Sequence, residues 1–265
     1  MQSLEIIGYI ASIAIGLILG LLGGGGSILS IPILVYLFQI DVVLASAYSL
    51  FIVGTTSLVG AIPKYKDHFV NVRTGLWFGI PSILAIFSTR RWIVHAIPEV
   101  VYDNDHILIT KRLLLLGIFA MLMIFASISM IRGRQETDSE ADRIRVGWLV
   151  VQGTVIGFLT GLVGAGGGFL IIPALVLLTG LTFKAAVGTS LFIISINSYS
   201  GFIGDFFNYD MNWRLLATIT SLAVAGILIG NKLSAKVPSQ LLRRIFGWFT
   251  LAIGFFILLK ELSAV

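Results

Sequence analysis

Two glycine-rich segments are the stretches of this chain best suited to bind a ligand. The first runs from Gly20 to Pro32 and the second from Gly161 to Pro173, with every position displaced by 141 residues and no gap. Glycine costs a helix interior about 1 kcal/mol relative to alanine and proline about 3 kcal/mol, so both segments predict breaks in apolar helices. A half-helix after such a break points free N–H groups and partial positive charge at the junction. We therefore expect a small-anion site; the alternative is that the glycines only allow close helix packing.

Hydroxyl and amide side chains on the helices after the breaks extend this predicted site. Ser49 and Ser190 occupy the same register of the two segments, and Asn197 is the side chain most costly to leave in lipid. Any single hydroxyl among them can instead bond back to its own helix. The candidate substrate-binding residues are Gly23, Gly24, Gly25, Gly26, Ser27, Ser49, Gly164, Ala165, Gly166, Gly167, Gly168, Thr189, Ser190 and Asn197. We expect Ser27 and Gly168 to face each other near the membrane centre.

The composition indicates a membrane protein that is not an enzyme. Hydrophobic residues fill 57% of the 265 positions and charged residues 12%, with a mean hydropathy of +0.99. The lack of cysteine excludes disulfides and thiolate chemistry. No Ser/His/Asp set, carboxylate pair or phosphate loop occurs, and His68, His95 and His106 fall in predicted loops without ligand spacing, so we expect no cofactor and no metal. The net charge of +5 comes without a basic, aromatic-rich segment, so nucleic-acid binding has no support.

The apolar segments predict an all-α polytopic membrane bundle. About 20 apolar residues cross the hydrocarbon core as a helix. The predicted spans are 4–22, 42–63, 72–90, 108–131, 146–163, 183–206, 213–231 and 241–259. Segments 27–38 and 168–179 are too short to cross alone and follow the breaks. Each is therefore expected to be a half-helix that forms a hairpin or a broken span with the preceding helix.

An internal duplication organises the predicted helices. At the same offset of 141 residues, Ser49 to Ile52 matches Ser190 to Ile193, which indicates two homologous halves. We expect a first transmembrane repeat at 1–131, a cytoplasmic linker at 132–145 and a second repeat at 146–265. Each half holds an odd number of crossings, so the second should be inverted relative to the first.

Loop charges predict the orientation of these halves. With the N-terminus outside, basic residues on the inner side outnumber those on the outer side by about two to one. We therefore expect a multi-pass protein of a prokaryotic inner membrane with both termini extracytoplasmic and 90–112 as the main outer loop. No charge is expected at the membrane centre. Lys64 and Asp205, at matched helix ends, are expected to extend to the interface.

Three motifs carry a resemblance to a known family: Gly20 to Gly26 with Pro32, Gly161 to Gly168 with Pro173, and Ala186 to Leu191. In these residues the chain resembles the sulfite exporter TauE/SafE family of membrane permeases. The resemblance implies two homologous halves in a helical bundle and movement of a small sulfur-containing anion. The halves differ at Tyr48 and Thr189, and Ala165 stands where the first half has Gly24, so two unequal half-sites are expected.

We expect a secondary transporter of a small sulfur oxyanion, such as sulfite or an organosulfonate, with export as the favoured direction. Alternating access would operate around the two breaks. The alternative is an anion channel whose pore is lined by the paired half-helices. Expected partners are the inorganic or organic sulfur anion, the lipid bilayer and a coupling ion. H⁺ and Na⁺ both stay open for coupling, because no acidic residue in a span marks a proton relay. The sequence leaves the oligomeric state undetermined.

Overall fold

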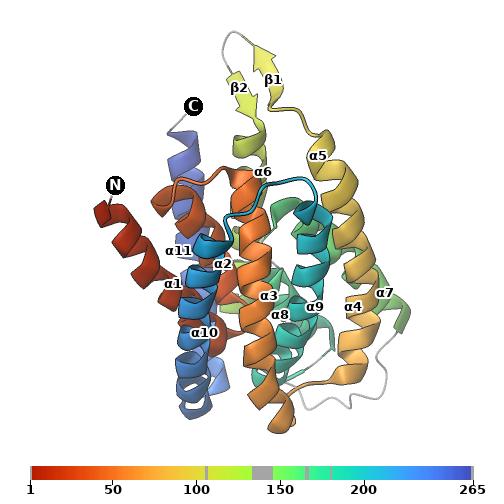
Figure 1. The fold of residues 1–265 in the computed structure, drawn as a ribbon. Coiled ribbons are helices and arrows are strands. Elements are labelled where there is room, and N and C mark those ends of the chain that lie inside the picture. The colour runs from red at the N-terminus through yellow and green to blue at the C-terminus, as the bar shows by residue number, and fades with distance from the viewer. Residues whose placement is uncertain (1, 105–106, 133–145, 165–166, 180, 264–265) are drawn as a thin grey trace.

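The computed structural model describes residues 2–104, 107–132, 146–164, 167–179 and 181–263, and it is a bundle of helices (Figure 1). The first half contains α1 (Gln2–Leu22), α2 (Gly25–Pro32), the π-helical turn η1 (Ile33–Leu37), α3 (Val42–Lys66), α4 (Val72–Ser88), the π-helical turn η2 (Thr89–Ile93), α5 (Val94–Ala96), β1 (Val100–Asn104), β2 (Ile107–Thr110) and α6 (Lys111–Arg132). The second half contains α7 (Val146–Val163), α8 (Gly168–Thr179), α9 (Phe183–Phe206), α10 (Trp213–Lys236) and α11 (Ser239–Leu262).

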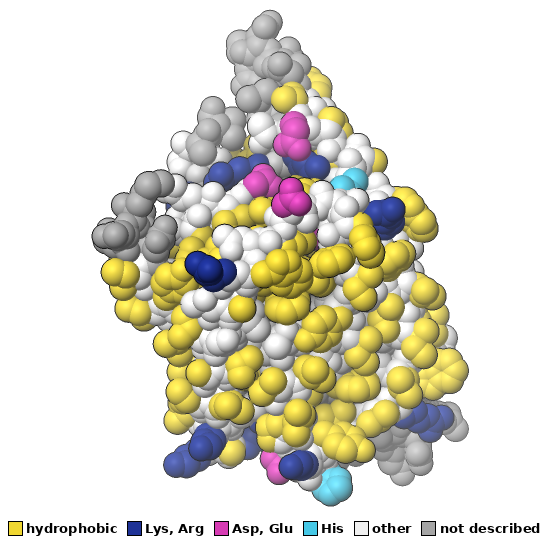
Figure 2. Space-filling model, in the orientation of Figure 1, with side chains coloured by type: hydrophobic (Ala, Val, Ile, Leu, Met, Phe, Trp, Pro, Cys, Tyr) yellow, Lys and Arg dark blue, Asp and Glu magenta, His cyan; other side chains and the backbone are white. Residues whose placement is uncertain are grey.

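Six helical segments of the described residues are long and apolar enough to cross a membrane. They are α3, the continuous segment Val72–Ala96, α6, α9, α10 and α11. Figure 2 shows hydrophobic side chains over the middle of the visible face and most charged side chains toward its two ends. This distribution is that of a multi-pass membrane protein, as the composition predicts.

The expected spans 4–22 and 146–163 coincide with the helices α1 (Gln2–Leu22) and α7 (Val146–Val163). Both helices end among buried residues because a glycine break follows each of them. The expected half-helix 168–179 coincides with α8, whereas 27–38 is divided into α2 and η1.

The segment expected as an outer loop is partly ordered into regular structure. The helix that begins at α4 continues through η2 and α5 to Ala96, and an antiparallel hairpin of β1 and β2 follows. The prediction of a loop from Arg90 was therefore wrong for its first turns. The apolar residues Trp92 to Val94 explain the difference, because they prolong the hydrophobic segment past the two arginines.

The helices pack in four pairs: α1 with α10, α4 with α7, α3 with α9, and α6 with α11. Glycine allows close backbone contact in two of these pairs, α1 with α10 and α4 with α7. A Cβ on Gly16 of α1 would lie 1.7 Å from the carbonyl oxygen of Ala223, and a Cβ on Gly157 of α7 would lie 2.6 Å from that of Ser82. Gly157 is the 141-residue counterpart of Gly16, as Ala223 is of Ser82. Exchanging the two halves therefore turns one contact into the other.

Candidate functional site

The two glycine breaks touch each other inside the bundle. A Cβ built on Gly24 would lie 2.5 Å from the carbonyl oxygen of Gly168, and one built on Gly168 would lie 2.7 Å from the Cα of Gly24. Only glycine at both positions allows this approach. Gly24 is the N-cap of α2 and provides no side-chain cap, while Gly168 is the first residue of α8. The N-terminal ends of the two half-helices therefore converge, which brings together two regions of partial positive charge.

The turns before these half-helices require glycine for their backbone angles. Gly23 has φ 73° and Gly164 has φ 77°, a region that side chains rarely adopt. A Cβ on Gly23 would lie 2.6 Å from Val187 Cγ1, and one on Gly164 would lie 2.3 Å from Ser46 Cβ. Val187 and Ser46 are themselves matched positions of the two halves. The two breaks thus have equivalent surroundings, each supplied by the opposite half.

Of the other predicted site residues at the breaks, the structure shows the surroundings of Gly26 and Gly167. Gly26 and Gly167 face their own hairpins, since a Cβ on Gly26 would lie 2.2 Å from the carbonyl oxygen of Ile15 and one on Gly167 would lie 2.3 Å from Thr160 Oγ1. Both glycines close the turns, and atoms of the preceding helix cover them. Gly25 opens α2, and Ala165 and Gly166 lie outside the described residues.

Ser27 and Ser49 lie beside the first break and are fully buried. The Ser27 hydroxyl donates to the carbonyl oxygen of Gly24 at 2.6 Å, and the hydroxyls of Ser30 and Ser49 lie 2.5 Å apart. The structure places Gly24 in contact with Gly168. Gly24 is the cap of α2 and precedes Ser27 by three residues, and the expected facing of Ser27 and Gly168 stays a prediction.

Thr189 and Ser190 of α9 have different surroundings. The Ser190 hydroxyl donates to the carbonyl oxygen of Val187 at 2.8 Å, which is a bond within its own helix. Thr189 Oγ1 accepts the backbone N–H of Asn71 at 2.9 Å, at the start of α4. Thr189 therefore fixes the turn between α3 and α4 and is engaged in the scaffold.

Asn197 is completely buried on α9, and only one of the two polar atoms of its side-chain amide has a described partner. Its Nδ2 donates to the Ser82 hydroxyl of α4 at 2.7 Å, whereas its Oδ1 has no partner among the described atoms. Ser57 and Ser198, matched positions of α3 and α9, also have buried hydroxyls without a described partner. Unpaired buried polar atoms favour water or a polar ligand along this helix pair.

A buried ion pair that the sequence did not predict lies next to the second break. Arg90 Nη2 is 2.5 Å from Asp205 Oδ2, and both side chains have no exposed surface. The same Nη2 donates to Ser46 Oγ at 2.6 Å, and Ser46 packs against Gly164. Arg90 also approaches the carbonyl oxygen of Gly161, near the C-terminal end of α7, where positive charge is favourable. The expected interfacial position of Asp205 was wrong, since its carboxylate is held inside the bundle by Arg90.

The residues around this ion pair connect it to the hairpin end of the bundle. His95 Nδ1 lies 2.7 Å from the backbone oxygen of Arg90, and its ring stacks at 5.6 Å on that of Tyr209. His95 therefore belongs to α5 and to this cluster, not to a loop. Burial and the nearby carboxylate of Asp205 raise the pKa of Tyr209 above its ordinary value. One sequence signal could have indicated this cluster: both repeats carry a charged residue at the same position, Lys64 in the first and Asp205 in the second.

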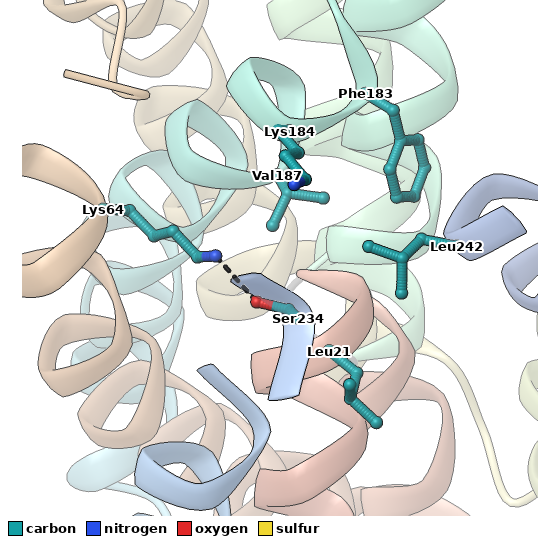
Figure 3. A pocket seen from close by; sticks show the side chains of 7 residues that line it. All are labelled: Leu21, Lys64, Phe183, Lys184, Val187, Ser234 and Leu242. Atoms are coloured by element: carbon teal, nitrogen blue, oxygen red, sulfur yellow. Dashed lines mark hydrogen bonds between the residues drawn. The ribbon is translucent and has the colours of Figure 1, made fainter. Parts of the chain in front are cut away.

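Basic residues border spaces at both ends of the bundle. One cleft, of about 370 Å³, is lined by Tyr9, Phe38, Asn212, Arg214, Leu215 and Thr218 near the hairpin end. At the opposite end, Lys64 and Lys184 lie near each other around a space too small to hold a water molecule (Figure 3). No group of three potential metal ligands occurs among the residues described here.

The fold and these buried polar elements define a polytopic membrane protein with polar groups held between its helices. The sequence model of the family described as sulfite exporter TauE/SafE matches residues 9–257, so the chain belongs to this family. Family membership makes the protein a membrane transporter and not an enzyme.

Curated relatives agree with this assignment over nearly the whole chain. A "Probable membrane transporter protein" of Xylella fastidiosa (strain Temecula1 / ATCC 700964) is 27% identical over 261 residues, 95% of this chain and 94% of the relative. "Probable membrane transporter protein YdhB" of Bacillus subtilis (strain 168) is 27% identical over 230 residues, covering 86% and 90%. "Probable membrane transporter protein MJ0441" of Methanocaldococcus jannaschii is 27% identical over 266 residues, covering 93% and 94%. No solved structure matches the chain significantly.

Proposed function

We propose that this transporter moves a small sulfur oxyanion, such as sulfite or an organosulfonate, through a site formed by the two glycine breaks. The observation that carries the proposal is the contact of Gly24 with Gly168. It brings the N-terminal ends of α2 and α8 together, and backbone amides at such ends bind oxyanions well. The absence of side chains at the contact brings the N-terminal amides of the two half-helices close together.

The charge balance at this site favours transport over tight storage. Arg90, which is bonded to the Ser46 that packs against Gly164, already has its charge balanced by Asp205. An anion at the breaks would therefore be held mainly by amide dipoles and hydroxyl groups. Binding of this kind is weak enough to allow release, as a transported substrate requires.

We infer further that the two halves, 1–131 and 146–265, form an inverted repeat that works by alternating access. Matched turns support this inference: the α3–α4 turn and the α9–α10 turn lie at opposite ends of the bundle in Figure 1. The reciprocal helix pairs α1–α10 and α4–α7 also support it, because an exchange of halves preserves them. Rocking of one half against the other would expose the breaks to alternate sides.

Flux through proteoliposomes tests the proposed substrate and mechanism. The expected result is saturable sulfite uptake that falls when an H⁺ or Na⁺ gradient is collapsed. Flux that does not saturate and proceeds at channel rates would favour an anion channel instead. Absence of sulfite and sulfonate flux from a correctly inserted protein would overturn the proposed substrate class.

The Gly24→Val variant tests the role of the breaks. A valine Cβ would lie within 2.5 Å of the Gly168 carbonyl, so the half-helix ends must separate. We expect transport to fall at least tenfold while membrane insertion is retained. Gly79→Ala is the matched control, because a Cβ at Gly79 meets nothing within 4 Å. Normal transport by Gly24→Val would contradict a backbone site.

A further inference from the structure

The cleft at the hairpin end of the bundle lies between α1 and the start of α10. Its volume of about 370 Å³ is bordered by Tyr9 of α1, by Phe38 after η1, and by Asn212, Arg214, Leu215 and Thr218 of α10 and its cap. A single ordered water needs only about 10 to 15 Å³ of such space. The cleft can therefore hold a group much larger than a water molecule.

The cleft exists because α1 and α10 touch only further into the bundle. A Cβ on Gly16 would lie 1.7 Å from the carbonyl oxygen of Ala223, which is direct backbone contact between the two helices. Two turns earlier, a Cβ on Gly8 would instead meet the ring of Phe38, at 2.7 Å. The rings of Tyr9 and Phe38 pack edge to face, with centroids 5.3 Å apart. This aromatic pair forms one wall of the cleft, and the first turns of α10 form the other.

Arg214 makes the cleft positive. Within the described part of the chain its side chain has no salt bridge and no hydrogen bond. Asp210, four residues before it, is exposed and forms no salt bridge with it, and the carboxylate of Asp41 accepts the N–H groups of Val43 and Leu44. The first turn of α10 adds partial positive charge. No acidic side chain lines the cleft to balance these charges.

The surroundings of the cleft are typical of the membrane interface. Trp213, next to Arg214, is 50% exposed, and tryptophan is enriched where the hydrocarbon core meets the headgroups. Ile6 and Ile10, beside Tyr9 on α1, are 59% and 65% exposed. Further along α10, Leu228 is exposed as well. A polar, positively charged cleft thus adjoins apolar surface that faces the lipid chains.

The other half carries the arginine without the aromatic wall. Arg73 is the 141-residue counterpart of Arg214, and it is likewise exposed in the first turn of its helix, α4. Val150 and Thr179 stand at the positions that match the two aromatic residues of the wall. The duplication alone therefore does not account for the aromatic pair beside Arg214.

We propose that this cleft binds the headgroup phosphodiester of a glycerophospholipid. The guanidinium of Arg214 pairs with the phosphate oxygens, a geometry for which arginine is well suited, and the acyl chains lie along Ile6, Ile10 and Leu228. A dissolved anion would gain only one exposed arginine, which contributes little in water, whereas a lipid also gains apolar contact. The bound lipid connects α1 and α10 where their direct contact ends. The site does not depend on which anion is transported.

Native mass spectrometry of the purified full-length protein, titrated with dioleoyl phosphatidylglycerol in neutral detergent, tests this site. We expect wild type to retain one tightly bound lipid and Arg214→Gln to bind it about tenfold or more weakly, because a charge-assisted pair is lost. Arg73→Gln is the matched control and should change the affinity less than twofold. Thr218→Trp introduces the residue of the matched position, Trp77, and should weaken binding about fivefold or more by filling the cleft while Arg214 stays.

Equal lipid affinity of wild type and Arg214→Gln, or an equal loss in Arg73→Gln, would overturn the proposal. Unchanged binding by Thr218→Trp would also overturn it, because the lipid would then lie outside the cleft. Arg214 and Thr218 are exposed, so both variants should unfold at the temperature of wild type without lipid; if one is less stable, the other decides. Dissolved glycerol 3-phosphate and sulfate should not displace the lipid. Displacement that depends on Arg214 would assign the cleft to a dissolved anion instead.

Discussion

At the scale of single residues, the two halves are more alike in contacts than in sequence. Tyr48 and Thr189 occupy matched positions and suggested unequal half-sites. In the structure, Tyr48 Oη accepts the backbone N–H of Asn212 at 2.6 Å, and Thr189 Oγ1 accepts that of Asn71 at 2.9 Å. The two hydroxyls therefore have the same structural task. The asymmetry lies in charge, with Arg90 and Asp205 beside one break and Lys64 and Lys184 beside the other.

The Asp205→Ala variant tests the buried ion pair. Removal of the carboxylate leaves Arg90 buried without a counter-charge, which is expected to destabilise the protein by about 3 to 5 kcal/mol. Thermal unfolding in detergent should therefore show a clearly lower midpoint. The double variant Arg90→Met/Asp205→Leu should recover most of the loss, because neither charge remains. Equal stability of Asp205→Ala and wild type would show that Arg90 does not depend on Asp205.

At the scale of helices, glycines along α1 and α7 form contact lines, called glycine seams here, that determine how closely the two halves pack. Gly16 and Gly20 of α1 lie directly against the backbone of α10, and Gly157 and Gly161 of α7 lie against α4. These seams hold the hairpins in place so that their broken ends meet. A transporter that rocks its halves would move along such smooth seams rather than through interlocked side chains.

The Gly16→Ala variant tests the α1–α10 seam. The added methyl would lie 1.7 Å from the Ala223 carbonyl, so α1 must move away from α10. The expected loss of stability is about 1 to 3 kcal/mol, as for other overpacked interiors. Gly117→Ala in α6 is the control, since its Cβ meets nothing within 4 Å and alanine favours a helix. Thermal unfolding in detergent should separate the two variants; similar midpoints would contradict a close-packed seam.

At the scale of the whole molecule, both chain ends lie at the end of the bundle that carries the β-hairpin (Figure 1). The α3–α4 turn lies at the other end. If the excess of basic residues on one side follows the positive-inside rule, the termini are extracytoplasmic and this turn is cytoplasmic.

Cysteine labelling tests this orientation, because the natural chain has no cysteine. Lys66 and Phe207 are matched, exposed positions in the two turns. In intact cells, a membrane-impermeant maleimide should label Phe207→Cys, whereas Lys66→Cys should react only after permeabilisation. The opposite pattern would reverse the orientation and keep the inversion. Reaction of both from one side would contradict inverted halves.

Much of the fold was predictable because it depends on local composition and on a repeated pattern. Apolar length predicted the six spanning segments, and the glycine runs predicted the breaks and α8. The Arg90–Asp205 pair was not predictable in the same way. Its partners are 115 residues apart in sequence, and nothing local shows which charges meet when α4 packs beside α9.

The sequence by itself determined that this is a polytopic helical membrane protein of the TauE/SafE family with two glycine breaks. The reason is that membrane insertion and helix termination depend on the residue types of short segments. Only the tertiary structure decided that Gly24 meets Gly168, that Arg90 and Asp205 neutralise each other, and that the buried Lys64 bonds to Ser234. These features depend on how helices distant in the chain pack, since burial and pairing of charge are properties of the assembled bundle.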